Sequence, residues 1–465
     1  MNASRVRRLG VSNAKCYIKT PAISLLAIPP LATVHVFGSF PWPTFSNSFA
    51  ARPGAFQNTL AVATFEHPVL IVGAGVAGLT LAQGLRLTSI TFRIFERHAQ
   101  SHVKQGHRFR ISKEGQAALD TVLSPRLQQL LRRTAPEKQT FAPRYVDARQ
   151  LDFGKPEPVD PAESGMPLDR TWLRMLLSIG LQDMITYDKQ FDSYKVEDDG
   201  LVLVRFSDGS FARGQLLVGA DGIKSRVREH LQPDRKLLDL ERWIMWGRTP
   251  VTDELMAKLD STDILSWCMC LDHVLLLYTA STLDANVQTV IEQRLVHLES
   301  EGALPDFSDY VYWAVCTAPW QFAPQLPRTV QEKERYLKAL SETWHPTLKY
   351  LLASATHELS ACVPILSSKP DIQIGRSPGA AGRVMLIGDA AHAMSPMGGS
   401  GGDTAIRDAA ELACMLSGEC SVEKIVEAFE ERMADRAKDK IEHSFRGGQT
   451  FWRGKAWNLY SEVEA

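Results

Sequence analysis

The chain has 465 residues, which is too long for one small domain and predicts two large domains or three smaller ones. Its 52 Lys and Arg residues nearly balance its 53 Asp and Glu residues, so it carries no basic footprint for nucleic acid. Hydrophobic residues make up 45% of the chain, which excludes a mainly disordered protein. The seven cysteines form no CxxC pair, which predicts a reducing compartment, most simply the cytoplasm, and no metal site.

Residues 1–66 differ in composition from the rest of the chain. No acidic residue precedes Glu66, and the segment contains Arg, Lys and Ser, as organelle transit peptides do. A disordered extension and a misjudged start codon are the alternatives. The apolar stretch over residues 22–37 is short and is interrupted by Pro29-Pro30, so we expect a leader here and no stable membrane span.

The first organised element is predicted at Val69–Val72, a short apolar run that is typical of a buried parallel strand. The motif Gly73-Ala74-Gly75-Val76-Ala77-Gly78 follows, and the apolar spacing after it predicts a helix. A second strand ends at Glu96. This order is the βαβ fingerprint of dinucleotide-binding proteins.

Each part of that fingerprint has a physical role. Gly73 permits the tight turn, Gly75 lets the backbone approach a pyrophosphate, and Gly78 lets helix and strand pack closely. The helix N-terminus offers unpaired N–H groups to the phosphates. Glu96 would accept hydrogen bonds from a ribose and repel a 2′-phosphate, which favours FAD or NAD over NADP at this turn.

Two further glycine motifs follow predicted strands. The strand at 216–219 leads into Ala220-Asp221-Gly222, and the strand at 383–387 ends in Gly388-Asp389. The segment Gly398-Gly399-Ser400-Gly401-Gly402 then precedes a predicted helix with Asp403 as its N-cap. Each motif alone is compatible with a plain turn or a flexible loop. Their order and spacing together are more specific.

Taken together, these motifs resemble those of the class A flavoprotein monooxygenases, which are related to p-hydroxybenzoate hydroxylase. The resemblance rests on GAGVAG with Glu96, GADGIKSRVR and GDAAHAMSPMGGSGGDTAIRDA, and residues 106–111 and 168–173 agree with it. It spans about residues 68–435 and is greatest to fungal secondary-metabolite enzymes, partly because of residues 245–250.

The resemblance implies an α/β fold in which a Rossmann-like FAD-binding domain is interleaved with a β-sheet substrate domain and followed by C-terminal helices. The expected boundaries are 67–236 and 371–435 for the two parts of the FAD-binding domain, 237–370 for the substrate domain, and 436–465 for a helical tail.

The same resemblance implies roles for individual residues. Glu96 would hold the adenosine ribose. Arg170, and one of Arg108 or Arg110, would face FAD oxygens; strand alternation puts Arg108 and Arg110 on one face, so the choice between them stays open. The remaining expected cofactor residues are Asp221, Asp389 and Gly402.

The Gly401-Gly402 turn also has a physical rationale. Reduced flavin carries negative charge at the pyrimidine edge of its ring, and a helix N-terminus that the backbone can present closely would stabilise it. Pro396 would line the face where oxygen reacts, and His392 is either part of this site or an ordinary packed histidine.

The middle of the chain is rich in aromatic residues, which are more often core than substrate contacts. Arg248 is the one cation there that we expect could meet an anionic or phenolic substrate. No catalytic residue is predicted, because the flavin supplies the chemistry.

The sequence therefore predicts an FAD-dependent monooxygenase that uses NAD(P)H and O2 to oxygenate an aromatic or polyketide-like small molecule. The alternatives are a halogenase, a desaturating oxidase and a flavin-binding protein without turnover. The WxWxIP motif of the halogenases is missing. The choice between NADH and NADPH and the oligomeric state stay open.

Overall fold

The computed structural model describes residues 66–100, 108–135, 144–146, 148–151, 158, 160, 165–259, 268–270, 274–278, 310–318, 322–371 and 382–464. All of them lie in one compact unit, Leu60–Ala465. Except for Glu66, the predicted leader lies outside the described residues.

A parallel sheet carries the dinucleotide fingerprint, and its strand order is β16-β10-β1-β2-β6. Its strands are β1 (Val69–Val72), β2 (Phe92–Phe95), β6 (Ile185–Thr186), β10 (Leu216–Gly219) and β16 (Val384–Leu386). Every residue of β1 and β10 is buried, as expected for a parallel sheet that is covered on both faces.

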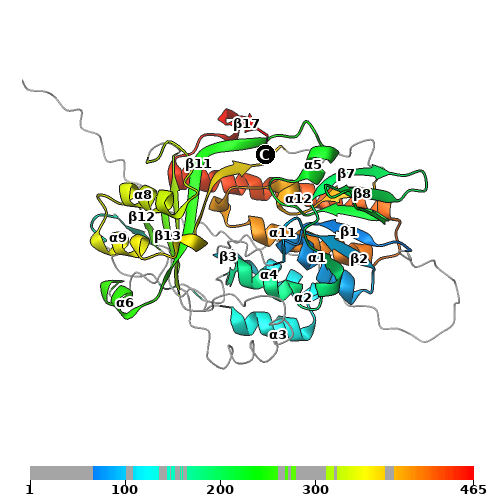
Figure 1. The fold of residues 1–465 in the computed structure, drawn as a ribbon, viewed down its shortest axis with the longest axis horizontal. Helices are drawn as coiled ribbons and strands as arrows, with labels where there is room; N and C mark the ends of the chain where they lie inside the picture. The colour runs from blue at the N-terminus through cyan, green and yellow to red at the C-terminus, as the bar shows by residue number, and fades with distance from the viewer. Residues whose placement is uncertain are drawn as a thin grey trace, which may run out of the picture. The chain divides into compact units, whose positions relative to one another are not determined.

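Helices from three parts of the chain pack together around this sheet. They are α1 (Val76–Leu87), α2 (Lys113–Val122), α4 (Arg170–Ser178), α11 (Gly401–Leu416) and α12 (Val422–Trp452). Helix α11 contacts α1, α2 and α12, and α1 contacts α4 (Figure 1). The residues after 382 thus complete a core that residues 69–231 begin, which confirms the predicted α/β fold class.

A second, larger sheet has the order β15-β11-β14-β13-β12-β4, and β17 pairs with β11. The strands are β4 (Arg144–Val146), β11 (Leu237–Pro250), β12 (Cys268–Cys270), β13 (Val274–Tyr278), β14 (Tyr310–Thr317), β15 (Ala361–Ser367) and β17 (Ser461–Val463).

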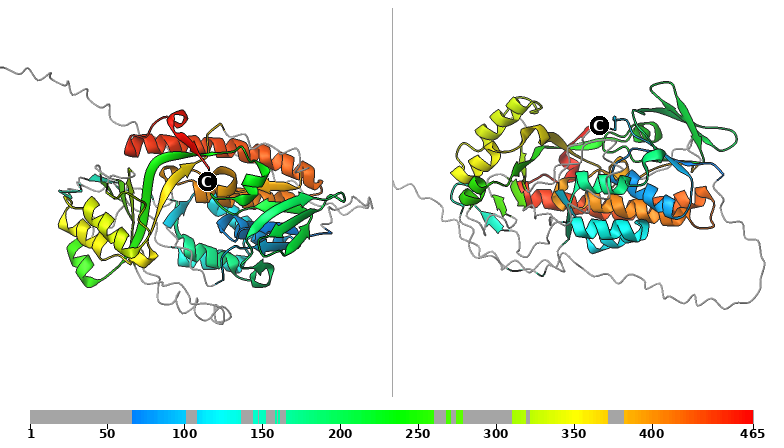
Figure 2. Two further views of the ribbon diagram at one scale, coloured as in Figure 1. Left: turned by 45° about the horizontal axis from the view of Figure 1, so that its top comes forward. Right: turned by 60° about the horizontal axis from the view of Figure 1, so that its bottom comes forward.

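Both faces of the second sheet are covered. Successive side chains of β14 point to opposite faces of the sheet, and both sets are packed against other parts of the protein. Val311, Trp313 and Val315 pack with α6 (Asp253–Leu259), α8 (Val330–Leu340) and α9 (Pro346–Ala353). Tyr310, Tyr312 and Ala314 share a core with residues of α12 on the other face. Figure 2 shows α8 and α9 in yellow on the side of this sheet away from α12.

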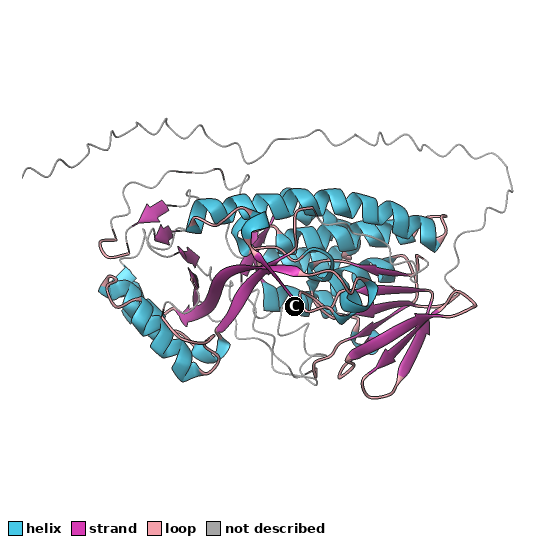
Figure 3. Cartoon of the chain, turned by 90° about the horizontal axis from the view of Figure 1, so that it is seen from above, coloured by secondary structure: helices cyan, strands magenta, loops and turns pink. Residues whose placement is uncertain are grey.

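The remaining elements are small. Strands β3 (Arg108–Ile111) and β5 (Met166–Asp169) form an antiparallel pair, and β7 (Phe191–Val196), β8 (Val202–Phe206) and β9 (Phe211–Gly214) form the antiparallel sheet seen in Figure 3. The short helices are α3 (Pro125–Thr134), α5 (Arg226–Leu231), α10 (Asp389–His392), η1 (Gln182–Met184), η2 (His357–Leu359), η3 (Pro396–Gly398) and η4 (Trp457–Leu459).

Two of the predicted domain boundaries can be compared with the ends of the observed helices and strands. Strand β11 begins at Leu237, where we placed the start of the substrate domain. Helix α12 runs without a break through the boundary placed at 435/436, and the tail after it contributes β17 to the second sheet. Within the described ranges, no helix is both long and apolar enough to cross a membrane.

Candidate active site

Four of the predicted cofactor positions lie at one edge of the parallel sheet. Gly73 follows β1, Glu96 follows β2, Asp221 follows β10 and Asp389 follows β16. These strands are parallel neighbours in the order β16-β10-β1-β2, so their carboxyl ends meet at the same edge. Open α/β sheets bind their ligands at this edge.

The glycines of the dinucleotide turn have different reasons to be glycine. Gly73 has a φ of +111°, and a Cβ there would lie 2.4 Å from the carbonyl oxygen of Ala220. A Cβ on Gly78 would lie 2.1 Å from the carbonyl oxygen of Gly73. The protein's own packing therefore requires both of these glycines.

Gly75 differs, because the nearest described atom to a Cβ there would be 3.9 Å away. It is also the N-cap of α1, and no side chain caps that helix. The turn therefore combines free space with an uncapped helix N-terminus, which is the arrangement that accepts a phosphate group. The residues present fit the pyrophosphate of a dinucleotide.

Glu96 is 2% exposed, and its carboxylate is bonded to the backbone. Oε2 accepts the N–H of Ala74 at 3.0 Å, and Oε1 accepts the N–H of His98 at 3.1 Å. Glu96 thus fixes the first half of the glycine turn. The ribose contact expected of it stays a prediction.

The predicted arginines lie on strand β3 and at the start of helix α4. Arg108 and Arg110 are both half-buried on β3. The Nε of Arg108 donates to the hydroxyl of Tyr310 at 3.1 Å, so Arg108 contacts the second sheet. Arg170 is exposed at the first turn of α4. The cofactor contacts of Arg110 and Arg170 stay predictions.

Arg174 lies one helical turn after Arg170, and the sequence analysis missed it. It is half-buried, and its Nε donates to the carbonyl oxygen of Ala74, inside the glycine turn, at 2.7 Å. The available signal was its spacing of four residues from Arg170, which places both side chains on one helix face.

The carboxylate of Asp221 is engaged within its own motif. It accepts the N–H groups of Arg226 at 2.8 Å and Val227 at 3.3 Å, and also the Ser225 hydroxyl. Burial raises the pKa of Asp221 above its ordinary value, against the effect of these hydrogen bonds. Asp221 therefore binds two N–H groups in the first turn of α5, whose N-cap is Ser225, and its contact to the cofactor stays a prediction.

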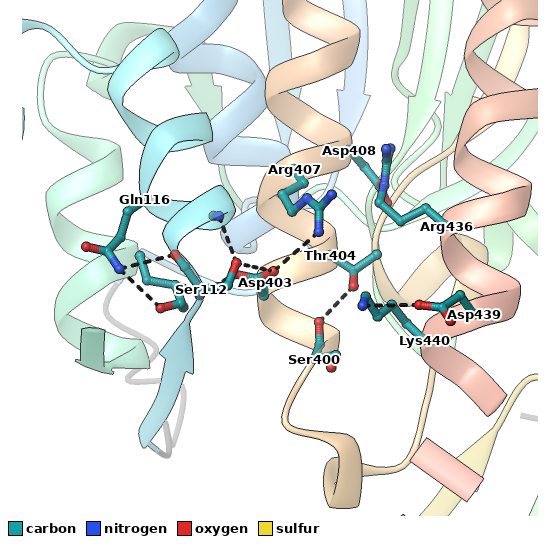
Figure 4. A network of polar contacts seen from close by, with 12 residues as sticks. Ser112, Gln116, Ser400, Asp403, Thr404, Arg407, Asp408, Arg436, Asp439 and Lys440 are labelled. Atoms are coloured by element: carbon teal, nitrogen blue, oxygen red, sulfur yellow. Dashed lines mark hydrogen bonds and ion pairs between the residues drawn. The ribbon is translucent and has the colours of Figure 1, made fainter. Parts of the chain in front are cut away.

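The glycine turn before α11 differs from the prediction in one respect. The helix begins at Gly401 with Ser400 as its N-cap, so the assignment of Asp403 as the N-cap is wrong. Asp403 instead accepts the N–H of Ser112 at 2.7 Å and its hydroxyl at 2.9 Å (Figure 4). Ser112 also caps α2, so this contact ties the first turn of α11 to α2.

The two glycines of this turn face different neighbours. A Cβ on Gly402 would meet the ring of Phe109 at 2.9 Å, whereas on Gly401 the closest described atom would be 3.5 Å away, in Met394. The carboxylate of Asp389 lies 4.0 Å from that Gly401 position. Gly402 is thus required by packing against Phe109, and Gly401 is the glycine beside Asp389. The flavin contact expected of Gly402 stays a prediction.

His392 is fully buried and belongs to a polar network across three helices. Its Nε2 bonds to Asp408 of α11, and Arg436 of α12 donates to Asp408 at 2.7 Å and to Glu411 at 2.8 Å. Burial would raise the pKa of Asp408, but His392 and Arg436 outweigh it and lower that pKa. Figure 4 shows Asp408 and Arg436 facing each other. The network fixes α10, which begins at Asp389.

Arg248 and Tyr310 meet where the second sheet approaches β3 and β5. The Arg248 and Arg108 guanidinium groups each lie 4.9 Å from the Tyr310 ring centre, and the Tyr310 hydroxyl donates to Asp169 at 2.6 Å. Of the other aromatic residues in this domain, Trp313 packs on the opposite face of the second sheet, and Trp267 lies outside the described residues.

Comparison with known proteins finds an FAD binding domain and similarity to monooxygenases. A profile described as "FAD binding domain" matches residues 367–444, which include α10, α11 and the glycine turn. The dual O-methyltransferase/FAD-dependent monooxygenase CTB3 of Cercospora beticola is 29% identical over 412 residues, covering 84% of this chain. The aurachin C monooxygenase/isomerase of Stigmatella aurantiaca is 26% identical, with 82% of this chain and 88% of that protein covered. The chain contains an FAD binding domain and is similar over most of its length to FAD-dependent monooxygenases.

Solved structures share the fold of this chain. A putative FAD-containing monooxygenase from Photorhabdus luminescens aligns with a TM-score of 0.68 and 24% identity, covering 83% of this chain and 98% of that chain. Klebsiella pneumoniae HpxO, solved with FAD and uric acid, aligns with a TM-score of 0.65 and 19% identity, covering 85% and 91%. The predicted family and the predicted cofactor, FAD, are confirmed.

This chain matches only part of the length of its fungal relatives. This chain spans 47% of the Cercospora beticola protein, and 40% of the dual O-methyltransferase/FAD-dependent monooxygenase elcB of Phaeosphaeria nodorum, to which it is 30% identical. It thus spans about half the length of these relatives or less.

Proposed function

We propose that this chain is an FAD-dependent monooxygenase that uses NAD(P)H and O2 to insert one oxygen atom into an aromatic or polyketide-like small molecule. The observation that carries the proposal is the turn at Gly75, where open space adjoins an uncapped helix N-terminus at the carboxyl edge of a parallel sheet. The relatives named as monooxygenases favour this activity over the halogenase, oxidase and non-catalytic alternatives.

The chain's own residues would bind and orient the reactants. The N-terminus of α1 would hold the pyrophosphate, and Glu96 would fix the turn beside the adenosine ribose. Backbone N–H groups at Gly401, which lies beside Asp389, would face the flavin ring. When bound, FAD supplies the electron transfer and oxygen chemistry, so no acid–base residue is assigned.

The substrate would bind on the α12-facing side of the second sheet. That face carries Trp246 and Tyr312, and Met394 of the loop after α10 packs against it. The face therefore adjoins the segment that follows Asp389. Aromatic and apolar side chains in this position suit a planar organic ring.

The experiment supplies the purified protein with NADH or NADPH, O2 labelled with ¹⁸O, and a panel of phenolic and polyketide-like compounds. We expect one compound to accelerate NAD(P)H oxidation and to gain one ¹⁸O atom, detected by mass spectrometry. A product that is dehydrogenated or halogenated without ¹⁸O would contradict the proposal. A reducing compartment such as the cytoplasm would supply the NAD(P)H that this activity needs. A cytoplasmic location is therefore part of the proposal.

A further inference from the structure

Helix α12 contains two adjacent glycines, Gly447 and Gly448, shortly before its end at Trp452. A glycine inside a helix is less stable there than alanine, so its presence needs a local reason. For Gly447 the reason is the turn η3, because a Cβ on it would lie 2.6 Å from the carbonyl oxygen of Met397 and 3.0 Å from the carbonyl carbon. Both of these atoms belong to the backbone, so they move only if η3 moves.

A second residue of α12 holds the same turn. Ser444 is fully buried, and its hydroxyl donates to the carbonyl oxygen of Ser395, the N-cap of η3, at 2.8 Å. A Cβ on Gly398, the last residue of η3, would lie 3.1 Å from the Cα of Ser444. Ser444 and Gly447 are three residues apart and share one face of α12. This face therefore supports η3 along its whole length.

The other side of this turn is open. Ser395 and Met397 are buried, whereas Pro396 and Gly399 are exposed. Gly399 has a φ of +61°, and a Cβ on it would meet no described atom within 4 Å. The turn is thus backed by α12 on one side, and described protein atoms leave its other side uncovered.

The turn leads directly to the N-terminus of α11. Only Gly399 and Ser400 separate η3 from Gly401, the first residue of α11, which lies beside Asp389. A shift of η3 therefore shifts the backbone N–H groups at Gly401. These groups are the donors that we expect at the reduced flavin, and their effect on its negative charge depends on distance.

We propose that Ser444 and Gly447 are positioning residues for the flavin: they seat η3 against α12 and so set the distance between the N-terminus of α11 and the reduced ring. This inference rests on the proposed function, because it requires FAD at that turn. Both residues lie in the segment 436–465, which the sequence analysis treated only as a helical tail. The C-terminal helix thereby tunes the reduction potential of FAD without touching it.

Gly448 provides the matched control. It is the neighbour of Gly447 on the same helix, and alanine favours the helix equally at both positions. A Cβ on Gly448 would meet the side chain of Trp452 at 2.9 Å, in α12 itself. Gly448→Ala therefore crowds a side chain of its own helix, whereas Gly447→Ala must displace the backbone of η3.

The experiment compares wild type, Gly447→Ala, Gly448→Ala and Ser444→Ala as full-length proteins loaded with FAD. The reduction potential of the bound flavin is measured by photoreduction against a reference dye. We expect Gly447→Ala to bind reduced FAD about tenfold more weakly relative to oxidised FAD, which lowers the potential by about 30 mV for a two-electron couple. Ser444→Ala should lower the potential by a smaller amount, and Gly448→Ala should keep the wild-type value.

Two results would overturn the inference. One is a wild-type potential in Gly447→Ala, and the other is an equal shift in Gly448→Ala, which would mean that any distortion of α12 has this effect. If Gly447→Ala does not fold, Ser444→Ala carries the comparison, and a wild-type potential in that variant has the same meaning. A wild-type protein that does not bind FAD would instead refute the proposed function, so the two failures are distinguishable.

Discussion

Glu96 and Arg174 hold the two backbone groups of the same residue, Ala74. Glu96 accepts its N–H at 3.0 Å, and Arg174 donates to its carbonyl oxygen at 2.7 Å. The two side chains come from the end of β2 and from α4. They fix both peptide planes next to Ala74, and with them the direction of the N–H groups at the start of α1.

Replacing Glu96 tests how much its carboxylate contributes to this arrangement. Glu96→Ala removes two charged hydrogen bonds, each worth about 1.5–3 kcal/mol, so we expect weaker FAD binding and a lower free energy of unfolding. Glu96→Gln keeps one carbonyl oxygen as an acceptor and should be milder. The measurements are FAD titration of the apoprotein and urea unfolding. An unchanged FAD affinity in Glu96→Ala would remove this residue from the site.

The glycines before α11 should respond differently to added side chains. Gly402→Val forces the helix away from Phe109, and overpacking of this kind costs about 1–3 kcal/mol of unfolding free energy. Shortening the partner in the Gly402→Val/Phe109→Ala double variant should restore part of that stability. Thermal unfolding of the apoproteins measures both, and no recovery in the double variant would mean that Phe109 is not the cause.

Gly401→Ala tests for a ligand next to the same turn. Described protein atoms leave room for a methyl group there, so the stability of the apoprotein should stay close to wild type. If flavin lies against this turn, flavin content and the rate of flavin reduction by NAD(P)H should both fall. Stopped-flow absorbance gives the rate, and wild-type values for both would place the flavin elsewhere.

The buried network at His392 should contribute strongly to stability. Asp408→Asn breaks a fully buried ionic contact and leaves the Arg436 guanidinium group without its buried anionic partner, a change worth about 3–5 kcal/mol of unfolding free energy. Glu411→Gln removes the other, half-buried partner of Arg436 and serves as the control, with a smaller loss. Urea unfolding at pH 7 gives both values. Equal losses would show that burial of Asp408 is not what makes the contact important.

Tyr310 gives a prediction for alkaline pH. Burial, with a contribution from Asp169, raises the pKa of Tyr310 to about 12, above the value of about 10 for an unfolded tyrosine. The folded state therefore favours the neutral phenol, and this stabilisation is complete below pH 10 and is lost as the pH rises towards 12. Tyr310→Phe should be less stable at pH 8 and should lose less further stability between pH 10 and 12. An equal loss of stability between pH 10 and 12 in wild type and Tyr310→Phe would contradict the raised pKa of Tyr310.

The sequence predicted the elements that local patterns determine. The strand, glycine turn and helix at residues 69–87 form as expected, because apolar runs, glycine spacing and helical periodicity all lie within that short segment. The Gly-Asp strand end at 384–389 was visible for the same reason.

The contacts that could not be predicted join segments that are far apart in the chain. Asp403 looks like an N-cap from its neighbours, but Ser112, which α2 and β3 position, provides closer donors. Arg174 looks like any arginine of an amphipathic helix until the packing of α4 on α1 brings it to Ala74. Local sequence does not contain this information, because it arises from the tertiary arrangement.

Identifying the bound flavin tests the central claim most directly. The protein is purified, its absorbance is recorded, and it is denatured by heat so that any non-covalent flavin is released and identified by chromatography. The account predicts a yellow protein that releases one FAD per chain, because the turn at Gly75 is built for a pyrophosphate. Release of FMN, or of no flavin from a folded protein that also fails to bind added FAD, would contradict it.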